Sequence, residues 1–191
     1  MYNEVNDSSA SATLKGWVES YSDSMYSWAL HKLSNKETAE DLVQETFMAA
    51  MVSMDKYKGD SNPKTWLFAI LNNKINDHYR HAFRNPQVDG LPDVEKWFDA
   101  NDQWKSEERP LDWAADTGHL LDDSDFQSVL HACMKRLPDH WFSAIQLKFI
   151  EEKNGNAICL ELGITNANFW QILHRAKLQL RKCLEVNWFK K

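Results

Sequence analysis

The sequence has 191 residues, 43% of them hydrophobic, and a net charge of −6. This length suits one large domain or two small ones, and the apolar content excludes a wholly disordered chain. No apolar run approaches the roughly 20 residues that span a bilayer, and the polar, partly acidic N-terminus excludes a signal peptide. We therefore expect a cytoplasmic protein with no membrane insertion.

Charge is distributed unevenly along the chain. The balance is −2 over residues 1–85, −9 over residues 86–128 and +5 over residues 129–191. Alternating, β-branched strand patterns are almost absent. The predicted fold class is therefore all-α, with two small helical domains at residues 1–85 and 126–191. An acidic, flexible linker at residues 86–125 joins them.

Three helices are predicted in the first block, at about residues 14–33, 36–54 and 63–84. Asp60, Ser61 or Asn62 can cap the third helix, and Pro63 fits its first turn, where a missing N–H costs nothing. Apolar residues at three- and four-residue steps predict the buried faces of the second and third helices. They are Val43, Phe47, Ala50 and Met54, then Phe68, Leu71, Ile75, Tyr79 and Ala82.

The other side of the third helix carries an aromatic ring, an amide and cations. Trp66, Asn73, Arg80 and Arg84 lie there, with Lys74 beside them. Such a surface suits single-stranded nucleic acid, because a ring that stacks on a base contributes about 1–3 kcal/mol and cations follow the phosphates. An Asn can read a base edge, and the polar loop before the helix can hold an extruded base. Periodicity alone equally allows Trp66 to pack inward and the cations to form a solvated face.

The linker is punctuated by prolines and glycines, with a short helix expected at about residues 94–104. Trp97, Trp104 and Trp113 are too many for a passive tether. We expect parts of the linker to dock on another surface, although a solvated tether is the simpler alternative.

The last block predicts four helices, at about residues 126–137, 139–152, 156–162 and 166–186. Trp141, Ile145 and Phe149 form a four-residue core stripe, and Gly163 between the last two helices predicts a helix-turn-helix. The last helix has a buried stripe and an opposite polar face. The stripe is Phe169, Ile172, Leu173, Ala176 and Leu180, and the polar candidates are Asn168, Gln171, His174, Arg175 and Lys177.

The cysteines Cys133, Cys159 and Cys183 cannot all pair, and none lies in a CxxC motif. In a cytosolic protein we expect them to be reduced and mostly buried.

Two stretches resemble a known family. DLVQETF (41–47) and YKGDSNPKTWLFAILNNKINDHYR (57–80) are similar to region 2 of bacterial RNA polymerase sigma factors of the sigma-70 family, extracytoplasmic-function (ECF) type. The stretch from RLPDHWF (136–142) to RKCLE (181–185) is similar to region 4. The resemblance implies a promoter-specificity subunit that binds core polymerase, recognises the −35 and −10 elements and opens the −10 DNA.

The resemblance also implies roles for matching residues. The core polymerase would be contacted through its β′ coiled coil and its β subunits. Asp41, Gln44 and Glu45 would dock on the β′ coiled coil, because an acidic exposed strip suits a cationic partner. Lys58, Gly59, Asp60, Ser61 and Asn62 would capture a flipped −10 base. Asn73 would help to set −10 specificity, and Trp66 would wedge the duplex or support the loop. Lys74, Arg80 and Arg84 would contact phosphates. Residues 166–181 would enter the major groove at −35. The acidic linker would thread along basic walls of the polymerase, and an anti-sigma factor is an expected partner.

The sequence departs from the family at NGNA (154–157), where glutamates are usual, and at Cys159, which is commonly Ala. A Gly loosens a helix start by about 1 kcal/mol. This allows the hypothesis that an accessory DNA-bound factor recruits the protein to its promoters.

Other classes remain as alternatives. A helix-turn-helix regulator would bind duplex DNA without polymerase, as a dimer on a palindrome. An adaptor without DNA contact fits poorly with the basic C-terminal block. The sequence has no GxxxxGK[ST], HExxH, GxSxG or CxxC motif. We therefore expect no catalytic residues, cofactor or metal site, because isolated side chains such as His131, Cys133 and His174 are far more often packing or surface groups.

Overall fold

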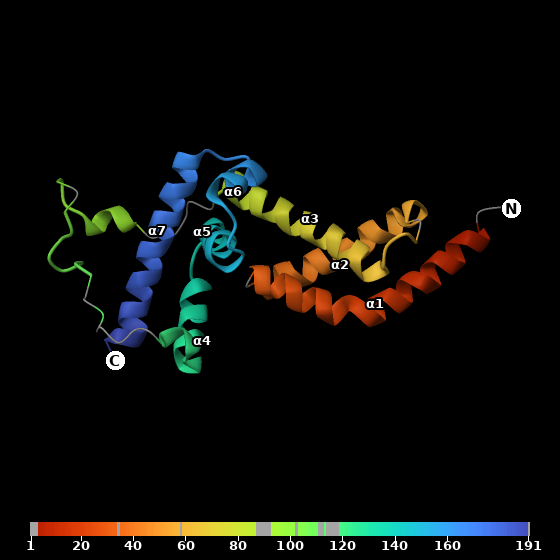
Figure 1. Ribbon diagram of the computed structural model, residues 1–191, viewed down its shortest axis with the longest axis horizontal. Coiled ribbons are helices and arrows are strands. Elements are labelled where there is room, and N and C mark those ends of the chain that lie inside the picture. The colour runs from red at the N-terminus through yellow and green to blue at the C-terminus, as the bar shows by residue number, and fades with distance from the viewer. Residues whose placement is uncertain are drawn as a thin grey trace. The chain divides into compact units, whose positions relative to one another are not determined.

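The computed structural model describes residues 4–33, 35–57, 59–86, 93–101, 103–110, 113 and 119–190, with side chains from residue 12 onward (Figure 1). The chain divides into two compact units, residues 1–79 and 80–191. Within the described ranges the architecture is all-α, as predicted, and the β structure there is an isolated bridge between Phe98 and Trp104. No helix in these ranges is long and apolar enough to cross a membrane.

Unit 1 contains α1 (Glu4–Leu33), α2 (Lys36–Val52), the short 3-10 turn η1 (Met54–Lys56) and most of α3 (Pro63–Arg84). The helix α1 begins ten residues earlier than predicted, through a stretch rich in Ser and Ala. Serine does not end a helix when its hydroxyl bonds back to a carbonyl four residues earlier. Ser20 does this farther along α1, donating to the carbonyl of Gly16 at 2.7 Å.

The core of unit 1 lies where the three helices meet. Fully or nearly fully buried residues come from each of them: Met25, Ala29, Leu33, Ala39, Val43, Ala50, Leu67, Leu71, Ile75 and Tyr79. The predicted stripe on α3 is therefore displaced by one position at both ends, from Phe68 to Leu67 and from Ala82 to Phe83. Phe68 is half-buried at the margin, where its ring meets Trp28 edge-on at 6.1 Å. On α2, Phe47 is likewise half-buried.

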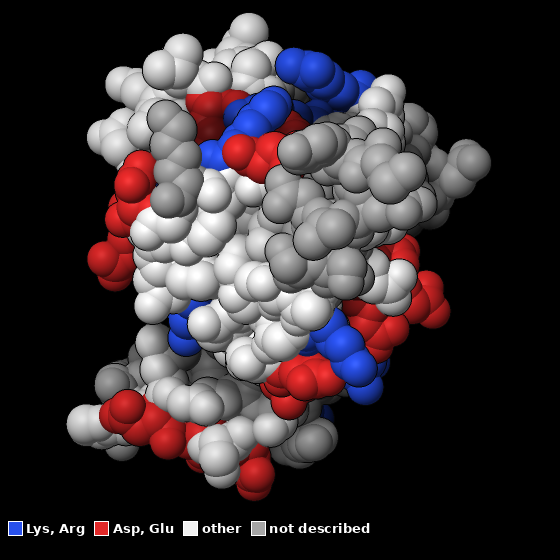
Figure 2. Space-filling model, turned by 90° about the vertical axis from the view of Figure 1, so that its right-hand side faces the viewer, with Lys and Arg blue, Asp and Glu red and all other residues white. Residues whose placement is uncertain are grey.

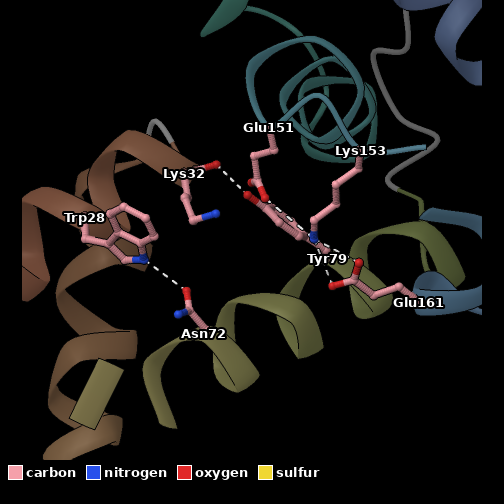
Figure 3. A network of polar contacts seen from close by, with 7 residues as sticks. All are labelled: Trp28, Lys32, Asn72, Tyr79, Glu151, Lys153 and Glu161. Atoms are coloured by element: carbon pink, nitrogen blue, oxygen red, sulfur yellow. Dashed lines mark hydrogen bonds and ion pairs between the residues drawn. The ribbon is translucent and has the colours of Figure 1, made fainter. Parts of the chain in front are cut away.

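Two hydrogen bonds tie α3 to α1 (Figure 3). The indole Nε1 of Trp28 donates to Oδ1 of Asn72 at 3.0 Å. The hydroxyl of Tyr79 donates to the carbonyl of Lys32 at 2.7 Å. A buried phenol needs such an acceptor, because a polar group removed from water without a partner costs about 1–3 kcal/mol. Both bonds therefore fix the rotation of α3 against α1.

Unit 2 contains α4 (Ser124–Met134), α5 (Asp139–Ile145), α6 (Gly155–Leu162) and α7 (Asn166–Leu184). Single π-helical turns follow α5 at Gln146–Ile150 and α7 at Glu185–Phe189, and 3-10 turns lie at Val94–Trp97 (η2) and Leu120–Asp122 (η3). In this unit Lys153 forms ion pairs with Glu161 at 2.9 Å and Glu151 at 3.6 Å (Figure 3).

The π turn after α5 places one predicted core residue, Phe149, at the surface. Trp141 and Ile145 are buried as expected, but Phe149 is 49% exposed. A π turn takes about one more residue than an α turn, so the four-residue step from Ile145 no longer returns to the core. Leu147 is completely buried there instead.

The helix-turn-helix of α6 and α7 is present as predicted. Gly163 has φ +69°, the left-handed conformation that glycine adopts without steric cost, and it ends α6. Thr165 then caps α7, because its hydroxyl accepts a hydrogen bond from the N–H of Asn168 at 3.2 Å. Phe169, Ile172, Leu173 and Ala176 are buried as expected, and Leu180 is half-buried.

The linker forms less helix than predicted. Its described part begins with η2 and then turns back, with an isolated bridge joining Phe98 to Trp104. Asp99 shapes this turn, because its carboxylate accepts from the N–H groups of Asn101 at 2.8 Å and Gln103 at 3.0 Å. An Asp side chain that bonds nearby backbone favours a turn over a helix, so the helix expected to reach Trp104 stops at Trp97.

The expectation of three reduced thiols is wrong for two of them. Cys133 of α4 and Cys183 of α7 form a disulfide, with Cα atoms 5.8 Å apart. Fifty residues separate them in sequence, which conceals that α4 and α7 pack side by side. Cys159 is free and buried, and its thiol donates to Oδ1 of Asn166 at 3.3 Å. Burial raises the pKa of the Cys159 thiol.

Candidate nucleic-acid interface

The acidic strip on α2 is exposed as predicted. Asn35 starts the helix, because its side chain accepts a hydrogen bond from the N–H of Thr38 at 3.1 Å. Asp41, Gln44 and Glu45 face solvent, whereas their neighbours on the opposite side of the helix are buried. The strip is therefore available to a partner and plays no part in the core.

A groove between α1 and α2 adjoins this strip. Its volume is about 360 Å³. Gln44 lies on its edge, and the walls combine apolar and acidic side chains: Val18, Ser22, Asp23, Tyr26, Glu40, Val43 and Phe47. An acidic, partly apolar groove beside an acidic strip suits a partner segment with basic and apolar residues.

The described part of the loop before α3 is exposed and carries its own hydrogen bonds. Gly59 has φ +77°, a left-handed conformation, and Gly59 to Asn62 face solvent. Asn62 caps α3, because its Oδ1 accepts from the N–H of Lys64 at 2.9 Å. The hydroxyl of Tyr57 donates to the carbonyl of Ser61 and closes the loop. Lys58, the remaining predicted loop residue, lies outside the described residues.

An aromatic cluster supports this loop from below. Trp66 is half-buried, with its ring 4.9 Å from that of Tyr57 and 6.1 Å from that of Trp17. Trp17 also meets Tyr57 edge-on at 5.3 Å. Such pairs contribute about 0.5–1.5 kcal/mol beyond the area that they bury. Of the two placements that the sequence left open for Trp66, the structure has the one in which its ring packs beneath the loop.

The two adjacent amides of α3 have different environments. Asn72 faces α1 and accepts the Trp28 hydrogen bond, whereas Asn73 is exposed and its side chain makes no hydrogen bond within the described residues. Lys74 beside it donates from Nζ to Oε2 of Glu45 at 2.8 Å. A predicted phosphate contact and a predicted polymerase contact therefore neutralise each other in the unbound protein.

The last turn of α3 belongs to unit 2. Arg84 is exposed. The Nε of Arg80 donates to the carbonyl of Glu161 at 2.8 Å, so this predicted phosphate contact is half-buried and engaged. In the space-filling view from the side on which α1 begins, separate groups of acidic and basic side chains lie around an uncharged area (Figure 2).

The polar face of α7 is mostly accessible. Asn168, Gln171, His174 and Lys177 are exposed. Arg175 differs, because its side chain is 32% exposed and forms an ion pair with Glu95 of the linker. Asn, Gln and Arg can each make two hydrogen bonds to a base edge in the major groove, and the face offers all three.

The start of α6 is well formed despite its glycine. The side chain of Asn154 accepts from the N–H of Asn156 at 2.9 Å and caps the helix. Gly155 is buried under Trp170, and a Cβ added there would lie 3.0 Å from Cζ2 of that indole. The glycine is needed for this close approach, so the expected loosening of the helix start is opposed by a cap and a ring contact.

Sequence reasoning missed several contributors to these surfaces. Trp17 and Tyr57 support the loop, and Glu95 engages Arg175. Tyr57 could have been found from its position at the edge of the loop. Trp17 and Glu95 act only through tertiary contacts, and no local pattern marks them.

Comparisons with known proteins agree on one class. The model of the family "Sigma-70 region 2" matches residues 17–84. A probable RNA polymerase sigma factor of Haemophilus influenzae is 32% identical over 163 residues, which cover 84% of this chain and 84% of that protein. The ECF RNA polymerase sigma factor SigM of Bacillus subtilis is 28% identical over 170 residues, covering 88% and 93%. A solved structure of the sigma factor RpoE with the anti-sigma factor NepR, from Bartonella quintana, gives a TM-score of 0.42 at 22% identity, covering 91% and 97%.

Proposed function

The chain belongs to the sigma-70 family of RNA polymerase sigma factors, ECF type, and on that premise we propose how its surfaces divide the work. As a sigma factor it binds core polymerase and directs promoter-specific initiation. Residues 1–85 would dock on the core enzyme and open the −10 element, residues 86–125 would form the linker, and residues 126–191 would read the −35 element. It would act in the cytoplasm, without catalysis of its own.

Core docking would use the strip of Asp41, Gln44 and Glu45. These side chains are exposed and share one helical face, and the groove beside them adds acidic walls. A cationic coiled coil of the polymerase β′ subunit would approach such a surface faster at low salt, because long-range attraction steers the encounter. The affinity for core polymerase should therefore fall clearly as the salt concentration rises.

Recognition of the −10 element would use the loop of Gly59 to Asn62 together with Asn73. The observation that carries this proposal is the loop itself, which is exposed, closed by Tyr57 and supported by Trp66. A loop whose conformation is already supported loses less entropy when it captures a flipped base. Lys74, Arg80 and Arg84 would contribute phosphate contacts, which position the strand without reading it.

Recognition of the −35 element would use α7. Asn168, Gln171, His174, Arg175 and Lys177 would face the major groove, with Trp170 flanking them on Gly155. Because Asn154 caps α6 and Trp170 packs on Gly155, we propose that this unit reads DNA without a recruiting factor. An anti-sigma factor is a further proposed partner, since members of this family are commonly held inactive by one. A duplex-binding regulator independent of polymerase is not favoured by the family assignment.

The test is transcription in vitro from a pool of genomic fragments with purified core polymerase. Wild-type protein should give promoter-dependent starts, Asp41→Lys should abolish them and Trp66→Ala should weaken them. Glu19→Lys on α1 is a matched control, because Glu19 is exposed and forms no ion pair within the described residues. Core binding without selective starts would point to a recruiting factor. Failure of both would remove the proposed function.

A further inference from the structure

We propose that the acidic linker segment of residues 93–110, the strap, docks on α7 and competes with promoter DNA for it. This inference rests on the proposed role of α7 in −35 recognition. The strap carries six acidic and three basic side chains, and its described residues lie beside α7 within unit 2 (Figure 1). It is an internal partner for the surface that would meet the phosphates.

Ion pairs join the strap to two cations of α7. The carboxylate of Glu95 pairs with the guanidinium of Arg175, and that of Glu108 pairs with the ammonium of Lys182. Arg175 is a candidate base reader, and one of its guanidinium nitrogens donates to the Glu95 carboxylate in the unbound protein. A carboxylate offers two acceptor oxygens in one plane, as does a phosphate, and the two groups compete for the same guanidinium.

Aromatic packing within the strap gives it a compact form. The rings of Trp97 and Trp104 stack with centroids 6.4 Å apart, and Phe98 adds a ring 4.5 Å from Trp104. Trp97 and Trp104 of the strap and Leu178 and Lys182 of α7 line one small hollow. Residues of the strap and of the helix therefore lie close together there, and the two tryptophans are half-buried.

A second aromatic contact lies farther along the linker. Trp113 stacks on Phe189 at 4.4 Å, and the guanidinium of Arg181 lies 4.8 Å from the centre of the Trp113 ring. Arg181 also pairs with Glu185 at 3.1 Å. Three of the cations on α7, at positions 175, 181 and 182, are thus engaged by groups of the same unit.

These contacts predict competition of moderate strength. A partly exposed ion pair is weak, so the loss of two pairs should strengthen duplex binding by only about three- to tenfold. DNA that displaces the strap gains the same cations, and each phosphate contact adds to the salt dependence of binding. The strap therefore lowers the affinity of the free protein for DNA without abolishing it.

The experiment compares full-length wild type with Glu95→Gln/Glu108→Gln. Glu107→Gln is the matched control, because Glu107 is exposed, lies in the same segment and forms no ion pair among the described residues. Binding to a fluorescently labelled duplex of random sequence is measured by anisotropy at fixed salt. The double variant should bind about three- to tenfold more tightly than wild type, and the control should stay near wild type.

Limited trypsin digestion reports the docking itself. The strap contains Lys96, Lys105 and Arg109, and docking should slow cleavage after them. Cleavage should be faster in the double variant, and in wild type after duplex is added. Equal duplex affinity for wild type and the double variant would overturn the inference, whatever the digestion shows. Equal digestion rates for these two proteins would also overturn it.

Failure of the proposed function would give a different set of results in these experiments. It would show as no duplex binding by any variant together with no −35-dependent transcription by the holoenzyme. Faster digestion of the double variant would then remain as evidence of docking, but the competition would be overturned.

Discussion

Nζ of Lys74 on α3 lies 2.8 Å from Oε2 of Glu45 on α2, and the two side chains belong to different proposed binding surfaces. Glu45 would meet polymerase and Lys74 would meet the phosphates of the −10 strand. The pair is partly exposed, with the carboxylate side chain 54% accessible. Engagement of either partner would therefore release the other, at a cost of about 1 kcal/mol or less.

This pair predicts separable effects of two substitutions. Glu45→Gln should weaken core binding and reduce its salt dependence, because a charge on the docking strip is lost. Lys74→Gln should leave core binding intact and weaken binding of single-stranded −10 DNA by the holoenzyme. Titration of labelled core at several salt concentrations checks the first effect, with Glu19→Gln as control. An equal loss of core affinity in both variants would show that the pair acts through the shape of α2 and α3.

The hydroxyl of Tyr57 predicts a defect in promoter opening with little loss of stability. Tyr57→Phe keeps the ring contacts with Trp66 and Trp17 but removes the hydrogen bond to Ser61. Such a bond contributes about 0.5–1.5 kcal/mol. The melting temperature should fall by a few degrees at most, while opening of the −10 region, followed by a fluorescent base analogue, should slow severalfold.

The opposite result for Tyr57→Phe is informative. Opening at the wild-type rate would show that the loop keeps its shape without this bond. Trp66→Phe is the companion variant, because it retains an aromatic ring of smaller area.

The disulfide predicts a stability that depends on reducing agent. Cys133 and Cys183 close a loop whose ends are 50 residues apart. In the chain-entropy treatment this cross-link raises the free energy of unfolding by about 4 kcal/mol, because it lowers the entropy of the unfolded chain. Dithiothreitol should lower the denaturant midpoint of the wild type, and Cys133→Ser/Cys183→Ser should unfold at one midpoint with or without it. Cys159→Ser is the control for thiol chemistry elsewhere. A wild-type midpoint unmoved by dithiothreitol, with the bond shown to be reduced, would contradict this expectation.

His140 predicts a loss of stability on mild acidification. Burial lowers the pKa of His140, and the neighbouring charge of Asp139 opposes this only in part. The unfolded chain, with a histidine pKa of about 6.5, then binds the proton more readily than the folded chain, so stability is complete above that pH and falls as the pH drops below it. Thermal melts between roughly pH 7.5 and pH 5.5 measure the effect.

The matched variants for this prediction are His140→Gln and His81→Gln. His140 is 5% exposed and its ring faces Phe83 at 6.2 Å, whereas His81 is exposed. His140→Gln should lower stability at neutral pH but reduce the further loss of stability between roughly pH 7.5 and pH 5.5, which we call the acid limb. His81→Gln should leave this acid limb unchanged. If both variants kept the wild-type limb, other groups would be responsible for it.

Features that depend on local signals were predictable from sequence. The Asn62 cap, the left-handed Gly163 turn and the exposed Asp41 face each follow from a few neighbouring residues. Helix ends were predicted less well where polar residues continue a helix, as at the start of α1. The π turn after α5 exposed Phe149, because a period of 3.6 does not apply through a π turn.

Features that depend on tertiary contact were not predictable in the same way. Helical periodicity allowed Trp66 to lie outside or to pack inward, and only the contacts with Trp17 of α1 and Tyr57 of the loop decide between the two. The bond between Cys133 and Cys183 requires α4 and α7 to be neighbours, which no spacing reveals. The docking of linker tryptophans was expected from their number, but their position on α7 was not.

The adjacent amides of α3 have a consequence for the spacing of promoter bases. Asn72 holds α3 to Trp28, so the rotation of the helix is fixed, and Asn73 is turned about 100° away from it. One residue inserted between Asn62 and Asn72 would turn Asn72 into the direction that Asn73 now has, and would turn Asn73 by about a further 100° away from it. Asn73 lies eleven residues beyond Asn62, or about 17 Å along the axis. The length of α3 between the loop and Asn73 would therefore set the distance along the DNA strand between the base held by the loop and the base contacted by Asn73.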